Sequence, residues 1–186
     1  MLVLASASPR RQELLRNAGI AFTVQPANLD ETLVPGESAR QCAERLAREK
    51  ALAVRASRPC ELVLGADTVV VVDGAVLGKP LNAEDAVHML QMLSGRVHEV
   101  ITGVCLAGPA EKIRIGSETT LVSVNVISVP EIRAYVATGE PMDKAGAYGI
   151  QGIASRWIPR IEGDYSNVVG LPIALVYRML REAEKI

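Results

Sequence analysis

The sequence predicts an α/β fold, a single domain in which a mixed β-sheet is flanked by helices. Three observations carry this prediction. β-Branched apolar runs of strand length alternate with stretches of helical periodicity along the chain. Capping residues precede the helical stretches, and glycines follow several of them. Turn signals join neighbouring strands into hairpins, which favours a mixed sheet over a purely parallel one.

The first third of the chain is typical of a strand followed by two helices. Residues 1–5 are apolar and strand-like, and residues 9–18 form an amphipathic helix that Ser8 caps. A capping box of Ser38 and Gln41 begins the second helix, which continues through the apolar positions that follow.

The rest of the chain alternates strands and helices. Asp73-Gly74 and Gly108-Pro109 are the turns that join strands, and Asn82 and Ser128 begin helices as capping residues. The expected elements, in order, are strands over residues 61–72 and 75–77, a helix over 82–93, strands over 97–107 and 112–127, a helix from 128 to 139, and a helix over 172–184.

Composition limits the classes of function. A chain of 186 residues with 49% hydrophobic content suits one core, so we expect a single domain over residues 1–186, with room for two lobes. A net charge of −1 gives no basic field, and 3% aromatic residues supply few stacking platforms, which argues against nucleic-acid binding.

Three cysteines without CxxC spacing predict reduced thiols. No apolar run approaches the ~20 residues of a membrane span, so we expect a soluble, cytoplasmic protein.

The stretch SASPRR, residues 6–11, predicts an anion site. Ser8 caps the helix, whose free amide N–H groups and positive dipole end face the preceding loop. Arg10 and Arg11 bring two guanidinium groups to the same turn, and phosphate is the anion that these groups would bind together with Ser8. The alternative is an ordinary capped helix with two solvated arginines.

Asp67 lies in a run of apolar residues, where an unpaired carboxylate would be costly to bury. It is either a structural carboxylate with a hydrogen-bonding or charged partner, or a metal ligand or general base. The small neighbours Gly65 and Ala66 favour function, because they leave room for a ligand. Lys50 falls on or beside the buried stripe of its helix and points either to the rim or into a cleft.

Three further segments add charge and polarity. GKP places Lys79 in a rigid turn, where it is a phosphate contact or a solvated lysine. Asp30-Glu31 is a magnesium ligand pair or a solvated loop pair. Residues 140–152 are glycine-rich, and Gln151 offers a donor and an acceptor to an amide-like base edge; the alternative is a packed loop. No dinucleotide, P-loop or nucleophile-elbow motif is present, so the inventory indicates metal-assisted phosphate hydrolysis.

These motifs, in this order, resemble the Maf family of nucleotide pyrophosphatases, long labelled septum formation inhibitors. The resemblance covers nearly the whole chain. The matching segments are SASPRRQELL, DE at residues 30–31, REKA, GADTVV, GKP, SGRVHEVITGV, DKAGAYGIQG and NVVGLP.

The resemblance implies an elongated fold similar to that of inosine triphosphate pyrophosphatases, with a cleft between two lobes. It also implies hydrolysis of a nucleoside triphosphate to the monophosphate and pyrophosphate with a divalent cation, Mg²⁺ or Mn²⁺. Asp67 would be the proton acceptor and a metal ligand, and Glu31 would assist the metal. The implied phosphate-binding residues are Arg11, Lys50 and Lys79, the two lysines being catalytic as well.

Within the family, the subgroup similar to dTTP and UTP pyrophosphatases carries an arginine, a threonine and a glutamine that match Arg10, Thr68 and Gln151. The subgroup acting on 7-methyl-GTP instead has tryptophan, glutamine and glutamate there. Gly78 departs from relatives that carry a glutamate before the lysine. Base-modified pyrimidine triphosphates are open as substrates, a nucleotide-binding regulator of cell division with incidental turnover is the alternative function, and a homodimer is left open.

Overall fold

The structure, a computed structural model, describes residues 1–29, 32, 34–109 and 112–184. The chain divides into two compact units, which are described separately. Unit 1 comprises Met1–Thr68, Thr102–Glu118 and Gly170–Ile186. Unit 2 comprises Val69–Ile101 and Thr119–Val169.

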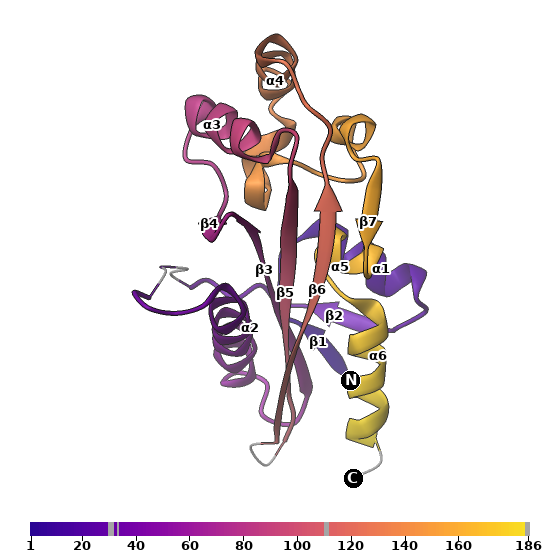
Figure 1. Cartoon of the computed structure of the whole chain (residues 1–186). Helices are drawn as coiled ribbons and strands as arrows, with labels where there is room; N and C mark the ends of the chain where they lie inside the picture. Colours follow the sequence, from indigo (N-terminus) through magenta and orange to yellow (C-terminus); the bar gives the residue numbers. More distant parts are fainter. Residues whose placement is uncertain (30–31, 33, 110–111, 185–186) are drawn as a thin grey trace. The chain divides into compact units, whose positions relative to one another are not determined.

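Strands and helices alternate along the chain (Figure 1). In order they are β1 (Leu2–Leu4), α1 (Pro9–Asn17), β2 (Phe22–Val24), α2 (Ala39–Arg55), β3 (Leu62–Val72), β4 (Ala75–Leu77), α3 (Ala83–Leu93), β5 (Val97–Ala107), β6 (Ile113–Ser123), α4 (Val129–Val136), the 3₁₀ helices η1 (Glu140–Asp143), η2 (Ala145–Ala147) and η3 (Ile153–Trp157), β7 (Arg160–Glu162), α5 (Tyr165–Val169) and α6 (Ile173–Glu184). Every expected element is present. The expected strand over 112–127 is shorter, because the chain leaves the sheet after Ser123.

The strands form a seven-stranded mixed sheet in the order β2-β1-β3-β5-β6-β7, with β4 paired to β3. β1 runs parallel to both β2 and β3, whereas β4 is antiparallel to β3, and β7 is antiparallel to β6. The prediction of a mixed sheet flanked by helices is therefore confirmed. At the β3–β4 turn, Asp73 and Gly74 have φ values of 49° and 81°, as a tight hairpin turn requires.

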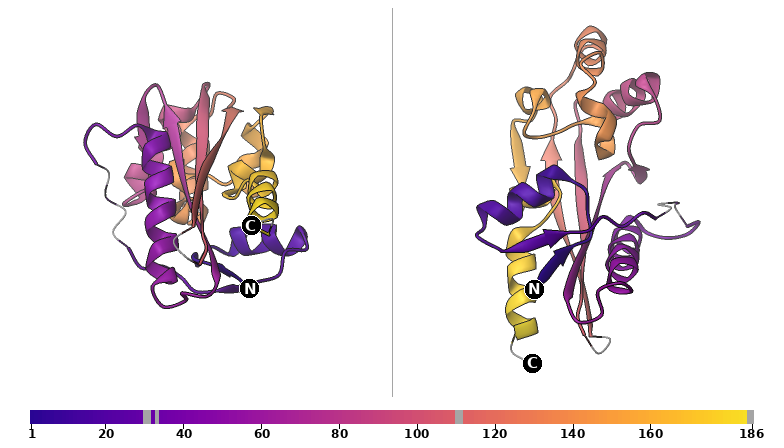
Figure 2. Two further views of the ribbon diagram at one scale, coloured as in Figure 1. Left: turned by 90° about the horizontal axis from the view of Figure 1, so that it is seen from below. Right: turned by 180° about the vertical axis from the view of Figure 1, so that it is seen from behind.

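In unit 1 the alternation of side chains along the strands separates two cores. Even-numbered residues such as Leu4 and Leu64 pack with α1 and α6. Odd-numbered residues such as Val3 and Val63 pack with α2. Figure 2 shows the strands between α2 and α6, so this unit has three layers. Successive residues of β3 therefore face different helices, according to whether the residue number is even or odd.

Unit 2 has a core of its own, built on α3, α4 and the 3₁₀ helices. Tyr135 of α4 and Trp157 of η3 meet edge to face, with ring centroids 5.3 Å apart, a favourable aromatic geometry. The capping boxes expected at Ser38 and Ser128 are present, in unit 1 and unit 2 respectively. Within the described residues, no helix has both the length and the apolar content to cross a membrane.

Candidate functional site

Unit 1 holds a buried ion pair between β3 and α2. The Nζ of Lys50 donates to Oδ1 of Asp67 at 2.6 Å, and each residue is only 7% exposed. Residues 63, 65 and 67 of β3 point to the face that α2 covers, which brings the carboxylate to the lysine. Lys50 thus supplies the charged partner that burial of Asp67 requires.

Two glycines allow α2 to lie this close to the sheet. A Cβ on Gly65 would lie 2.1 Å from the carbonyl oxygen of Ala47, and one on Gly103 would lie 2.3 Å from that of Ala43. The space beside Gly65 is therefore filled by the backbone of α2. The prediction that Gly65 leaves room for a ligand is wrong, because glycine here serves close helix–sheet packing.

The burial of this pair points to function more than to stability. Taking two charges out of water costs several kcal/mol per ion, of the order of what their attraction returns, so a buried ion pair adds little net stability. A paired carboxylate and ammonium in a protein interior are instead a frequent feature of catalytic sites. Asp67 can accept a proton, and Lys50 can stabilise negative charge, within one hydrogen bond of each other.

Thr68 follows Asp67 and points to the opposite face of β3. Its Oγ1 accepts a hydrogen bond from Nη2 of Arg11 at 3.0 Å and shares another with Oγ1 of Thr102 at 2.9 Å. Nε of Arg11 donates to the carbonyl oxygen of Gly170 at 2.7 Å, and Nη1 donates to Oγ of Ser6 at 3.3 Å. One guanidinium thus joins three segments that are distant in the sequence.

The loop before α1 is built as the sequence predicts. Ser8 is the N-cap, and its Oγ accepts the N–H of Arg11 at 3.4 Å. The N–H of Ser8 in turn donates to Oγ of Ser6 at 3.2 Å. Arg10 lies half-buried on the first turn of the helix. The capped turn is confirmed, whereas phosphate binding by Ser8 and Arg11 stays a prediction.

Thr102 was not singled out by the sequence, although it belongs to this network. It is fully buried and interrupts an apolar strand, which is the same signal that drew attention to Asp67. A buried hydroxyl needs a hydrogen-bond partner, and Thr68 provides one. Thr102 therefore helps to fix the residue next to the candidate catalytic aspartate.

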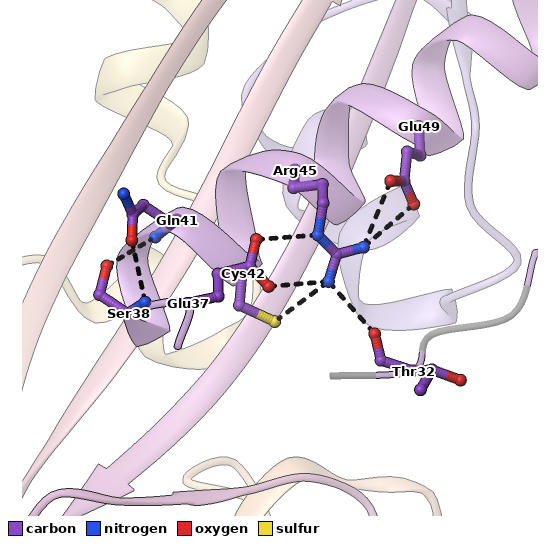
Figure 3. Close-up of polar contacts among 7 residues, drawn as sticks. All are labelled: Thr32, Glu37, Ser38, Gln41, Cys42, Arg45 and Glu49. Carbon is purple, nitrogen blue, oxygen red and sulfur yellow. Dashed lines mark hydrogen bonds and ion pairs between the residues drawn. The ribbon is translucent and has the colours of Figure 1, made fainter. Parts of the chain in front are cut away.

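Arg45 of α2 binds Glu37 and Thr32, two residues that precede the helix (Figure 3). Nε and Nη2 of Arg45 bind the two carboxylate oxygens of Glu37 at 2.8 and 2.9 Å, and Nη2 also donates to the carbonyl oxygen of Thr32 at 3.2 Å. The hydrogen bond with Glu37 raises the pKa of Arg45, and the same bond lowers the pKa of Glu37. The expected metal-binding pair Asp30-Glu31 lies outside the described residues.

Unit 2 contains the other two expected site residues, Lys79 and Gln151. Both side chains are exposed. The N–H of Gly146 donates to the carbonyl oxygen of Gly78 at 3.0 Å, which ties the turn of Lys79 to the glycine-rich segment before Gln151. Within that segment Gly146, Ala147 and Tyr148 are buried, whereas Gln151 is exposed.

Several proteins resemble this chain over most of its length. A dTTP/UTP pyrophosphatase of Koribacter versatilis is 60% identical over 98% of this chain and 94% of its own length. Proteins with the same name from Syntrophomonas wolfei and Symbiobacterium thermophilum are 54% and 53% identical, over 95% and 97% of this chain and 94% and 93% of their own.

Solved structures show a weaker likeness. The Staphylococcus aureus Ham1 protein has a TM-score of 0.48 and 14% identity, covering 66% of this chain and 71% of its own. A dITP/XTP pyrophosphatase of Mycobacterium abscessus has a TM-score of 0.41 and 16% identity, covering 66% of this chain and 72% of its own. The family of Maf-like proteins, by contrast, matches residues 1–183. Together with its relatives at 53–60% identity, this match places the chain in the Maf-like protein family.

Proposed function

We propose that this chain hydrolyses dTTP and UTP, and pyrimidine triphosphates with a modified base, to the nucleoside monophosphate and pyrophosphate. The observation that carries the proposal is the buried Asp67–Lys50 pair next to Thr68. Support for the substrate class comes from relatives named dTTP/UTP pyrophosphatase that cover nearly the whole chain.

In the proposed reaction Asp67 accepts a proton from the water that attacks the α-phosphorus. The bond from that phosphorus to the oxygen bridging to the β-phosphate breaks, and its electron pair leaves with pyrophosphate. Lys50, and with it Lys79, stabilises the negative charge that grows on the phosphate oxygens. General-base catalysis of this kind contributes ~10²- to 10⁴-fold to the rate.

A divalent cation, Mg²⁺ or Mn²⁺, fits the donors of this site as a partner of the substrate. Among the residues that the structure describes, no three His, Cys, Asp or Glu side chains gather to hold a metal. Asp67, whose Oδ1 accepts the hydrogen bond from Lys50, is the carboxylate that this pair offers to a cation. Asp67 would hold Mg²⁺ together with phosphate oxygens and water, as in magnesium sites with one or two carboxylates, and the charge of the cation would neutralise the leaving pyrophosphate.

Excess chelator should therefore abolish pyrophosphate release, and added Mg²⁺ or Mn²⁺ should restore it. A chain that is fully active in excess chelator would remove the cation from the proposal. The thermal unfolding midpoint, measured in the same buffers, separates loss of the cation from loss of the fold.

Base selection is assigned to Gln151 together with Arg10 and Thr68. A neutral amide presents one donor and one acceptor, which suits the alternating carbonyl and N3–H edge that uracil and thymine share. Thr68 has Arg11 and Thr102 as hydrogen-bond partners, which fix the position of its hydroxyl in unit 1.

Gln151→Glu tests the assignment, because it replaces an amide donor with a charged acceptor. Rates on dTTP and UTP should fall more than rates on purine triphosphates, since a site built on hydrogen bonds discriminates strongly when one is mismatched. A parallel decline on every substrate would overturn the base contact. A wild-type chain that binds UTP without turning it over would favour the regulatory alternative.

A further inference from the structure

Glu140 of unit 2 supports the turn that carries Gln151. The N–H of Gly152 donates to the carbonyl oxygen of Gly149 at 3.1 Å, so Gln151 is a central residue of this turn. Directly after the turn, the N–H of Ile153 donates to both oxygens of the Glu140 carboxylate, at 3.2 and 3.3 Å. The end of the turn is therefore fixed by a charge-assisted hydrogen bond.

The turn also packs directly on the side chains of η1 and its neighbour. A Cβ added to Gly152 would lie 2.0 Å from Oε1 of Glu140, and one added to Gly149 would lie 2.7 Å from Cε of Lys144. The backbone at Gly152 has φ −101° and ψ −152°, which needs no glycine. Glycine is required there because the Glu140 carboxylate occupies the space that a side chain would take.

Glu140 is itself held from two sides. The buried hydroxyl of Tyr135 donates to Oε1 at 3.0 Å, and Nζ of Lys144 donates to the carbonyl oxygen of Glu140 at 2.5 Å. Burial raises the pKa of Tyr135, and the bond to Glu140 adds to that shift, so the phenol stays a neutral donor. The carboxylate thus links the core of unit 2 to the turn.

We propose that Glu140 is a positioning residue for base selectivity, which holds residues 149–153 so that Gln151 presents its amide in one direction. The proposal rests on the proposed function, because it takes Gln151 to be the residue that meets the base. A fixed turn lets Gln151 bind without the entropic cost of ordering it, which lowers the KM for the matching base. We call the Glu140 carboxylate with its hydrogen bond from the N–H of Ile153 the clamp. Loss of the clamp removes that advantage for pyrimidine triphosphates and leaves other triphosphates unaffected.

Two substitutions remove the clamp by different routes. Glu140→Ala deletes the carboxylate, and Gly152→Ala displaces it, because the three atoms nearest the new methyl all belong to Glu140. Each should lower kcat/KM for UTP about tenfold, mainly through KM, a change of the size expected when one hydrogen bond of a binding group is lost. kcat/KM for ATP and GTP should stay the same, so the pyrimidine preference falls about tenfold.

The double variant Glu140→Ala/Gly152→Ala tests the route. Without the carboxylate the new methyl has room, so the double variant should lose no more than Glu140→Ala alone. Glu140→Gln keeps the shape and should fall between wild type and Glu140→Ala. Glu99→Gln, which removes an exposed carboxylate from β5 of the same unit, is the matched control and should change nothing.

Gln151→Ala distinguishes failure of this proposal from failure of the proposed function. If Gln151→Ala leaves the pyrimidine preference intact, the base contact is wrong and the role of Glu140 falls with it. If Gln151→Ala lowers the preference but neither clamp variant does, the positioning role alone is overturned. Additive losses in the double variant, or an equal fall of kcat on every substrate with a lower unfolding temperature, would likewise overturn it.

Discussion

Lys50 and Lys79 belong to the same predicted set of phosphate-binding residues, but their surroundings differ. Lys50 is buried against Asp67, whereas Lys79 is exposed in a turn of unit 2. The sequence indicates both as cations and places Lys50 beside a buried stripe, because helical periodicity is visible in the pattern. It does not reveal the partner of Lys50, since a contact between a helix and a strand depends on tertiary packing.

The two lysines should therefore respond differently to truncation. Lys79→Ala should slow hydrolysis by ~10²- to 10³-fold, as when one charge stabiliser is lost, and leave the free energy of unfolding unchanged. Lys50→Ala should slow hydrolysis to a similar extent and also destabilise the chain by about 3 kcal/mol, because it leaves a carboxylate buried without its partner. Urea unfolding beside the pyrophosphate assay measures both effects. Equal stability losses would contradict the difference in environment.

Asp67→Asn should remove most turnover while the fold survives. The amide keeps the shape and still accepts a hydrogen bond from Lys50, but it cannot take a proton from water; loss of a general base costs ~10²- to 10⁴-fold. Steady-state rates, with circular dichroism as the control for folding, check this. Near-normal activity would remove Asp67 from its catalytic role.

Helix α2 is an element that local sequence patterns predict well. The Ser38–Gln41 capping box and the apolar stripe located this helix, and both come from local sequence. The short strands β2 and β7 were not expected, because three residues carry too little pattern and gain their structure from the strands beside them. Gly65 was misinterpreted for a related reason: a glycine marks a close approach, but the sequence does not say what approaches.

Gly65→Ala tests the close packing of α2. The added methyl would overlap the backbone at Ala47 and Ala51, so α2 must shift, and overpacking of this kind costs about 1–3 kcal/mol. Activity should fall as well, because Lys50 moves with the helix. Gly116→Ala on β6 is the control, since its methyl would meet Leu175 at 3.5 Å, an ordinary contact. A neutral Gly65→Ala would show that the packing is looser than described.

For the molecule as a whole, the sequence predicts the α/β architecture and the candidate site residues of each unit. It does not predict the polar groups that support those residues. Glu140 was passed over because it acts by accepting a backbone N–H, and no motif marks such a contact. His98 on β5 is a second such residue, because its role depends on a tertiary contact that no motif marks. It is a buried core residue whose Nε2 lies 2.7 Å from Oη of Tyr148.

His98 should make stability depend on pH. Burial lowers its pKa from the ordinary value of 6.5 to about 4, so between these values the unfolded chain binds more protons than the folded one. Its contribution is complete above pH 6.5 and is lost as pH falls through 4, amounting to about 3 kcal/mol at most. Between pH 7 and pH 4.5, the free energy of unfolding measured with urea should fall less for His98→Asn than for wild type. Equal losses would contradict a buried neutral histidine.

The proposed reaction splits pyrimidine nucleoside triphosphates between the α- and β-phosphates. The most direct test incubates the wild-type chain with dTTP, UTP, ATP and GTP in the presence of Mg²⁺ and separates the nucleotide products by anion exchange. We predict TMP and UMP, each with one equivalent of pyrophosphate, formed much faster than any purine monophosphate. Preference for a purine triphosphate, or formation of UDP with orthophosphate, would contradict the account.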